Sequence, residues 1–233
     1  MFSYNYEKWI KRWIEMGAIC GPVCNRSTKD TYIALRHDID RIENHENIDL
    51  MASIEERNGI RSSYYILVAN NYKYYNKYKI LFRNIQKRGH EIGLHVSSME
   101  LSHNPWKARE KKDANIQLRK DIDKMIQDGF NLRTMSAHGS PFKYNNKDLM
   151  ADANIATPVN FSSLFSLDDC ILTDSRGEKL ATSTNVFNEL SPGIYYSLTH
   201  PQLFYRINNE LLSKAQTMIH IGDIEYSELN RLA

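Results

Sequence analysis

The first half of the chain repeats one pattern, in which an amphipathic helical segment ends at a glycine and a strand-like apolar run follows. The glycines are Gly59, Gly89 and Gly129, and the runs that follow them cover 60–68, 90–96 and 131–138. Glycine often ends a helix because it adopts the left-handed backbone conformation at low energy. Strands that alternate with helices favour parallel pairing through right-handed crossovers. The pattern therefore predicts an α/β fold.

Further segments extend the pattern on both sides. An amphipathic helix at about 6–17 precedes an opening strand that runs from Tyr32 to Asp40. Later strand candidates lie at 157–161, 170–173 and 193–199, and a helical pattern covers 208–218. The total is about seven strands. Because no low-complexity linker divides them, we expect a single domain over residues 1–233.

The composition excludes several classes of protein. The net charge is +2 and the basic residues are dispersed among acidic ones, which argues against a nucleic-acid surface. The sequence lacks a signal peptide and an apolar run of the ~20 residues that span a bilayer, so we predict a cytoplasmic protein without a membrane span. Three cysteines, an odd count, argue against a disulfide framework. We interpret Cys20 and Cys24 as reduced thiols rather than half of a zinc site.

Titratable side chains gather where the predicted strands end. The opening strand ends in Asp38 and Asp40, and later strands end in His95, His138 and His200. In parallel α/β folds the functional site lies at the carboxyl ends of the strands, so these side chains are expected on one rim.

The two aspartates of the opening strand need a positive partner or solvent. Asp38 and Asp40 are two residues apart, so on an extended backbone their carboxylates project to one face and repel each other. A divalent cation, an arginine or water could each relieve that repulsion. His90 cannot share a cation with His95, because about 16 Å of strand separates them.

Aspartate with histidine is a donor set that suits a divalent metal such as zinc, with one position kept for water. A second carboxylate can act as general base, and a histidine from another strand can protonate a leaving amine. These groups suffice to hydrolyse an amide or an ester. The sequence contains no serine or cysteine nucleophile motif and no glycine-rich phosphate loop.

Three motifs resemble those of the polysaccharide deacetylases of the NodB-homology class, carbohydrate esterase family 4. They are Leu35-Arg36-His37-Asp38-Ile39-Asp40, Gly89-His90-Glu91-Ile92-Gly93-Leu94-His95 and Leu198-Thr199-His200-Pro201. The first motif indicates a variant subgroup with Arg-His-Asp-x-Asp. The resemblance covers roughly residues 30 to 205 and implies a distorted, incomplete (β/α) barrel of about seven strands. It also implies zinc or a similar divalent ion and an N-acetylated sugar or related amide as substrate.

The resemblance also implies roles for individual residues. Asp38 would be the general base, Asp40 and His95 metal ligands, and His200 the acid that protonates the leaving amine. The family usually supplies a second histidine four residues after the first, and here Met99 holds that position. A thioether is a poor ligand for a hard catalytic zinc.

Either another residue supplies the third ligand, or the metal is weakly bound or absent. We predict His138, which ends the fourth strand, with His37 and His103 as second choices. We expect four further residues to contact the substrate: Arg36, His37, Asp174 and Arg176.

The sequence therefore predicts a metal-dependent hydrolase that removes an acetyl or other N-acyl group from an amino sugar or related small amide in bacterial glycan metabolism. The first alternative is a catalytically degenerate barrel that binds a glycan or an interaction partner, which Met99 favours. The second alternative is a metallo-phosphoesterase of another barrel type.

Overall fold

A computed structural model of the 233-residue chain describes residues 2–25, 30–40, 45–68, 72–101, 104–152, 170–173 and 192–201. The chain divides into two compact units. The first unit comprises Met1–Ser63 with Phe165–Ala233, and the second comprises Tyr64–Leu164. None of the helices among the described residues is long and apolar enough to cross a bilayer.

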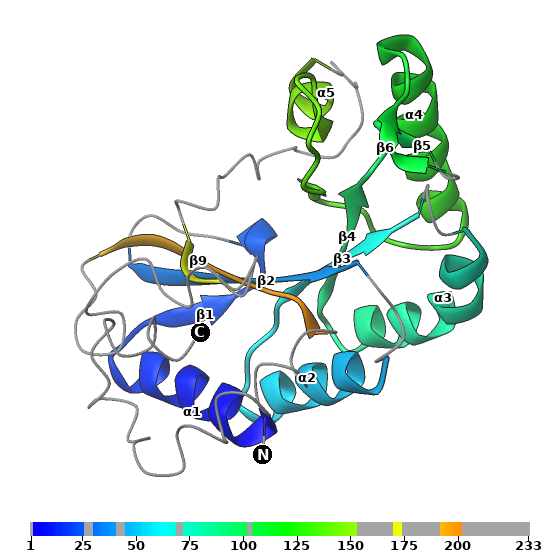
Figure 1. The fold of residues 1–233 in the computed structure, drawn as a ribbon. Helices are drawn as coiled ribbons and strands as arrows, with labels where there is room; N and C mark the ends of the chain where they lie inside the picture. The colour runs from blue at the N-terminus through cyan, green and yellow to red at the C-terminus, as the bar shows by residue number, and fades with distance from the viewer. Residues whose placement is uncertain are drawn as a thin grey trace. The chain divides into compact units, whose positions relative to one another are not determined.

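The first unit is built on parallel strands in the order β1–β2–β9–β8. Its elements are α1 (Phe2–Glu15), β1 (Ile19–Gly21), the 3-10 helix η1 (Val23–Asn25), β2 (Thr31–Ile39), α2 (His45–Arg57), β8 (Cys170–Thr173) and β9 (Gly193–Thr199). Strand β9 comes from the far end of the described chain, yet it lies beside β2 (Figure 1). Every residue of β2 after Thr31 is buried, as expected of a central parallel strand covered on both faces.

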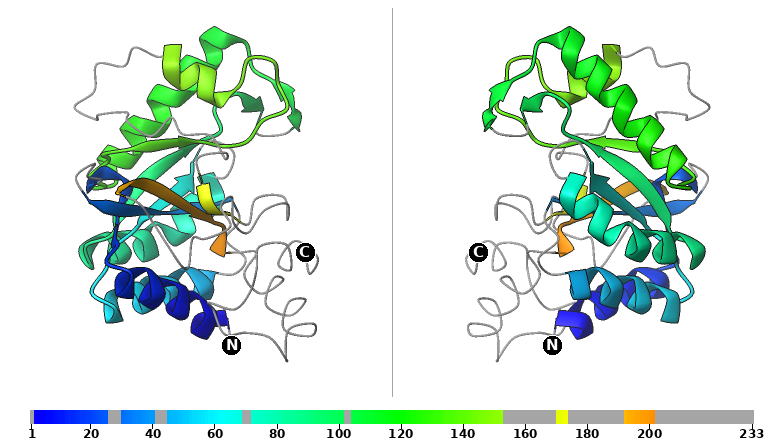
Figure 2. Two further views of the ribbon diagram at one scale, coloured as in Figure 1. Left: turned by 90° about the vertical axis from the view of Figure 1, so that its left-hand side faces the viewer. Right: turned by 90° about the vertical axis from the view of Figure 1, so that its right-hand side faces the viewer.

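Helix α1 covers this sheet through one apolar face. Tyr6, Ile10 and Trp13 are all fully buried, and their spacing of four and then three residues places them on one side of the helix. The helix contacts α2 and β1, and Figure 2 shows α1 and α2 side by side. The predicted helix at 6–17 is therefore present but begins earlier.

The second unit contains three neighbouring strands in the order β3–β4–β7 and a small antiparallel hairpin, β5–β6. Its elements are β3 (Ser63–Leu67, which begins at the last residue of the first unit), α3 (Tyr72–Lys87), β4 (Glu91–Val96), β5 (Glu100–Leu101), β6 (Asn104–Ala108), α4 (Lys111–Gln127), β7 (Met135–Ala137) and α5 (Asn146–Asp152). Strands β4 and β7 pair in parallel, and α3 and α4 both contact β4.

The predicted alternation of helix, glycine and strand is confirmed. Gly59, Gly89 and Gly129 follow α2, α3 and α4, with φ angles of 72°, 96° and 85°. The fold class is thus α/β with a parallel sheet, which has seven strands among the described residues. The strand predicted at 131–138 is shorter, because only Met135–Ala137 pairs with β4. The predicted strand at 157–161 and helix at 208–218 lie outside the described residues.

Asp128, the residue after α4, anchors this helix to α3. Its carboxylate accepts hydrogen bonds from Lys79 Nζ at 2.8 Å, Lys124 Nζ at 3.0 Å and Tyr75 Oη at 2.9 Å. Burial alone would raise the pKa of Asp128, but these three donors outweigh it and lower the pKa from 3.8 to about 2. A carboxylate whose pKa is depressed in the folded state stabilises the fold above its unfolded pKa.

We therefore expect Asp128→Asn to lower the free energy of unfolding by about 1 kcal/mol near neutral pH, after allowance for solvent screening. The difference from the wild type should persist down to about pH 4, shrink as the pH falls further, and vanish only below about pH 2, where Asp128 is protonated in both states. Urea unfolding across this pH range measures it. Asp123→Asn, at an exposed position of α4, is the control and should behave as the wild type does. A difference that stays constant with pH would contradict the prediction.

Candidate functional site

Asp38 is paired with an arginine near the carboxyl end of β2. Arg36 Nε and Nη2 donate to the two carboxylate oxygens of Asp38 at 2.7 and 2.6 Å. Both side chains are buried, with 7% and 4% of their surface exposed. Of the possibilities that the sequence left open for the repulsion between Asp38 and Asp40, arginine is thus the partner of Asp38. A two-pronged, charge-assisted pair of this kind fixes the direction of the carboxylate.

Asp40 lies beside His200 at the same edge of the first unit. His200 Nε2 is 3.5 Å from Asp40 Oδ2, and both residues follow the last residue of their strands. The parallel register of β2 and β9, which aligns His37 with Thr199, explains why these two strand ends meet. Asp40 keeps 28% of its side chain exposed, although its Oδ1 atom is buried.

His37 lies inside the first unit, in a buried polar network. Its Nδ1 lies 2.7 Å from Thr199 Oγ1, and its Nε2 lies 2.7 Å from Glu55 Oε1. Glu55 also accepts hydrogen bonds from Tyr6 Oη at 2.5 Å and from Ser62 Oγ at 2.6 Å. His37 is 1% exposed. The structure therefore places this predicted substrate contact among α1, α2 and β9, where it ties the ends of β2 and β9 together.

Two cysteines of the first unit lie near its first strand, Cys20 on β1 and Cys24 in η1. Neither Cys20 nor Cys24 forms a disulfide. Burial, with a smaller contribution from the charge of Glu55, raises the pKa of the Cys20 thiol to about 12. Because the thiolate is the form that binds metal, Cys20 is not prepared to act as a ligand at neutral pH.

In the second unit, His95 has its ring fixed by the neighbouring strand. His95 is on β4 and is 2% exposed. Its Nδ1 lies 2.8 Å from Ser136 Oγ and 3.3 Å from the Ser136 carbonyl oxygen. A carbonyl can only accept, so this contact favours a proton on Nδ1 and a lone pair on Nε2. That is the arrangement in which a histidine binds a metal through Nε2.

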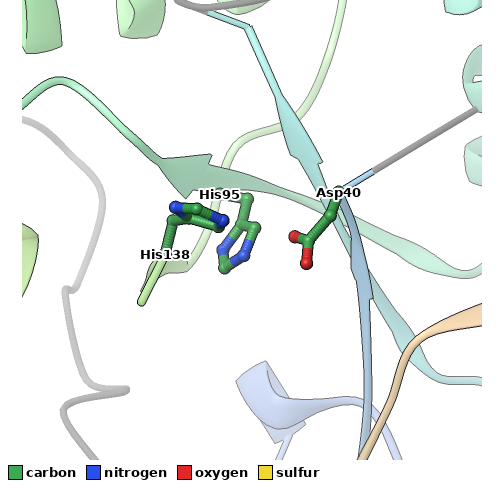
Figure 3. Close-up of side chains that lie close together, drawn as sticks. All are labelled: Asp40, His95 and His138. Carbon is green, nitrogen blue, oxygen red and sulfur yellow. The ribbon is translucent and has the colours of Figure 1, made fainter. Parts of the chain in front are cut away.

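His138, just after β7, lies against His95. The ring centroids are 5.2 Å apart and the planes are nearly perpendicular, and one ring nitrogen of each lies within 4.8 Å of the other. The His138 backbone N–H donates to the Val96 carbonyl at 2.9 Å, and Asn146 Nδ2 donates to the His138 carbonyl at 3.1 Å. Figure 3 shows the two rings together and Asp40 at the end of β2.

Met99 lies in the turn between β4 and β5, and the residue is 3% exposed. Its backbone is held on both sides, because the Met99 N–H donates to Asn146 Oδ1 at 3.0 Å and its carbonyl accepts from Arg109 N–H at 2.7 Å. Sequence reasoning missed the next residue, Glu100, whose Oε1 lies 3.6 Å from His138 Nδ1. It also missed Asn146 and Ser136. No motif marks these positions, since their partners are distant in the sequence.

The remaining candidates are placed as follows. His90 is 3% exposed at the other end of β4 from His95, with its ring edge-on to Tyr64 at 5.5 Å. His103, Asp174 and Arg176 lie outside the described residues.

Comparison with known proteins bears on the fold. No family model matches the sequence, and no curated protein matches it. Among solved structures, the chain is similar to a mutant of BA3943, a CE4 family pseudoenzyme with restored enzymatic activity. The identity is 12% and the TM-score 0.50, and the match covers 84% of this chain and 66% of that one. The chain thus spans about two thirds of the length of that protein. At this identity the likeness concerns the fold alone, and it supports the predicted fold of the CE4 polysaccharide deacetylases.

Proposed function

We propose that the protein is a metal-dependent hydrolase that removes an acetyl or other N-acyl group from an amino sugar or a related small amide. The proposal assigns one divalent ion, most simply zinc, to Asp40 of the first unit together with His95 and His138 of the second. Each of these side chains offers one ligand atom. One carboxylate with two imidazoles is a donor set of catalytic zinc sites, which keep a position for water.

The observation that carries this proposal is the histidine pair of the second unit. One ring nitrogen of His95, on β4, and one of His138, just after β7, lie within 4.8 Å of each other, and the Nδ1 of His95 is held by Ser136. Histidine rings that only fill a core need neither this proximity nor a fixed tautomer. This arrangement suits metal binding, because a hydrogen bond to the ring nitrogen that does not bind the metal orients the histidine ligand.

The first unit contributes the groups that move protons. When bound, a divalent ion lowers the pKa of a coordinated water towards about 7 and polarises the substrate carbonyl. Asp38 takes the proton of the attacking water. Arg36 donates to both oxygens of Asp38, and each oxygen keeps a further lone pair for this purpose. His200, held beside Asp40, donates a proton to the departing nitrogen.

Met99 favours a second candidate, a barrel of this fold that binds a glycan or a partner without catalysis. A methionine at the usual place of a metal-binding histidine removes one ligand of the family pattern. The two candidates differ in metal content, because the degenerate barrel needs no stoichiometric ion.

We therefore expect the purified protein to bind one equivalent of zinc and to release acetate from N-acetylated amino sugars. His95→Ala should abolish both properties. His90→Gln is the control, since His90 immediately precedes β4 and lies five residues from His95, and this variant should keep both properties. Elemental analysis and an acetate-release assay measure the outcome. A wild-type protein that binds no divalent ion and hydrolyses no amide would support the degenerate barrel instead.

A further inference from the structure

The most elaborate hydrogen-bonded cluster beside the histidine pair surrounds Glu100, a residue with no role in the proposed function. Glu100 is 3% exposed. Asn146 Nδ2 donates to its two carboxylate oxygens at 2.9 and 3.1 Å. The Oε1 atom then lies 3.6 Å from Nδ1 of His138. Burying a carboxylate costs free energy unless its oxygens accept hydrogen bonds or face a positive charge. The position of Glu100 beside an imidazole therefore indicates an interaction between the two side chains.

Asn146 links the Glu100 carboxylate to the backbone at His138 and at Met99. Its Nδ2 also donates to the His138 carbonyl at 3.1 Å, and its Oδ1 accepts the Met99 N–H at 3.0 Å. Arg109 fixes the same turn, because its Nη1 donates to the carbonyls of Ser98 and Glu100. The position of Glu100 relative to His138 is therefore set by several contacts rather than by one rotatable side chain.

We infer that Glu100, held by Asn146, is the positioning residue for His138: the negative charge of its carboxylate, 3.6 Å from Nδ1, favours the tautomer with the proton on that nitrogen and so presents Nε2 of His138 as a metal ligand. A carboxylate behind a histidine ligand fixes the ring, selects the tautomer and raises the basicity of the ligating nitrogen. Ser136 fixes the tautomer of His95 in the corresponding way. The inference rests on the proposed function, because it assumes that His138 binds the ion.

The same contacts assign a role to the turn around Met99. The turn does not supply a ligand from position 99, but it carries Glu100 and offers the Met99 N–H to Asn146. The segment that usually brings a second histidine would thus orient a histidine from another strand. On this basis Met99 marks a relocated ligand rather than a lost site.

The test uses the full-length protein with Glu100→Gln, which removes the charge and keeps the shape of the side chain. Competition with a chromophoric chelator should show zinc bound about 10–100-fold more weakly than by the wild type. Glu110→Gln is the control, because Glu110 is exposed and its side chain makes no cap hydrogen bond; its zinc affinity should equal that of the wild type.

A second measurement needs no metal. Nitrogen-15 NMR of the metal-free wild type should show neutral His138 with its proton on Nδ1, and Glu100→Gln should shift the ring towards the Nε2–H form. A wild-type ring protonated on Nε2 overturns the inference even if the variant does not fold, and so does an unchanged zinc affinity in a folded variant. A wild type that binds no zinc refutes the proposed function, whereas zinc bound equally well by both proteins refutes the inference alone.

Discussion

Asp40→Asn should weaken zinc binding and lower the rate of amide hydrolysis by on the order of 10³-fold or more. A bound divalent ion contributes several kcal/mol of stabilisation to the transition state, and about 4 kcal/mol corresponds to that factor. The neutral amide of asparagine keeps an oxygen in place but loses the charge that a hard cation prefers. Acetate release and zinc titration on the same preparation measure the two effects together.

The control for this substitution lies at the other end of the same strand. Asp30 precedes β2 and is exposed, so Asp30→Asn changes the same charge without reaching the carboxyl end of the strand. It should bind zinc and hydrolyse amides as the wild type does. If Asp40→Asn retains both properties, Asp40 is not a ligand, and the carboxylate of the site must be sought elsewhere.

Local sequence patterns predicted the sheet and most of the helices, because the features that define these elements involve residues close together in the sequence. Helix-ending glycines act within a few residues, and the buried run of β2 is apolar along its whole first half. Shorter elements escaped this reasoning. Strand β1 has three residues and β5 has two, which is too few for any periodicity to be recognised.

Side-chain roles were harder to predict when they depend on distant partners. The sequence motif made His37 a candidate to contact substrate, yet its neighbours in space are Glu55 and Thr199, which are 18 and 162 positions away. Likewise, Glu100 acquires its position from Asn146, 46 residues further on. Arg36 and Asp38 are only two residues apart, and an arginine was among the partners that the sequence suggested for the two aspartates. Separation along the chain, more than residue type, decided which roles could be predicted.

The buried pair of Arg36 and Asp38 leads to the largest expected effect on stability. Arg36→Met should lower the free energy of unfolding by about 3–5 kcal/mol, because it leaves the carboxylate of Asp38 buried without its partner. Urea unfolding measures this change. The exposed pair of Arg57 and Glu7, at 2.9 Å, gives the contrast: Arg57→Met should lower the free energy by no more than about 1 kcal/mol.

The double variant Arg36→Met with Asp38→Leu separates stability from catalysis. Removing both charges leaves neither member of this pair as a buried ion without the other, so the free energy of unfolding should return to within about 1 kcal/mol of the wild type. Zinc should still bind, since Asp38 is not among the proposed ligands. Hydrolysis should nevertheless fall by about 10²–10⁴-fold, the usual contribution of a general base. A stable, zinc-loaded double variant with full activity would show that the pair is structural and that another group accepts the proton. A stable variant without zinc would show instead that the pair orients the neighbouring Asp40.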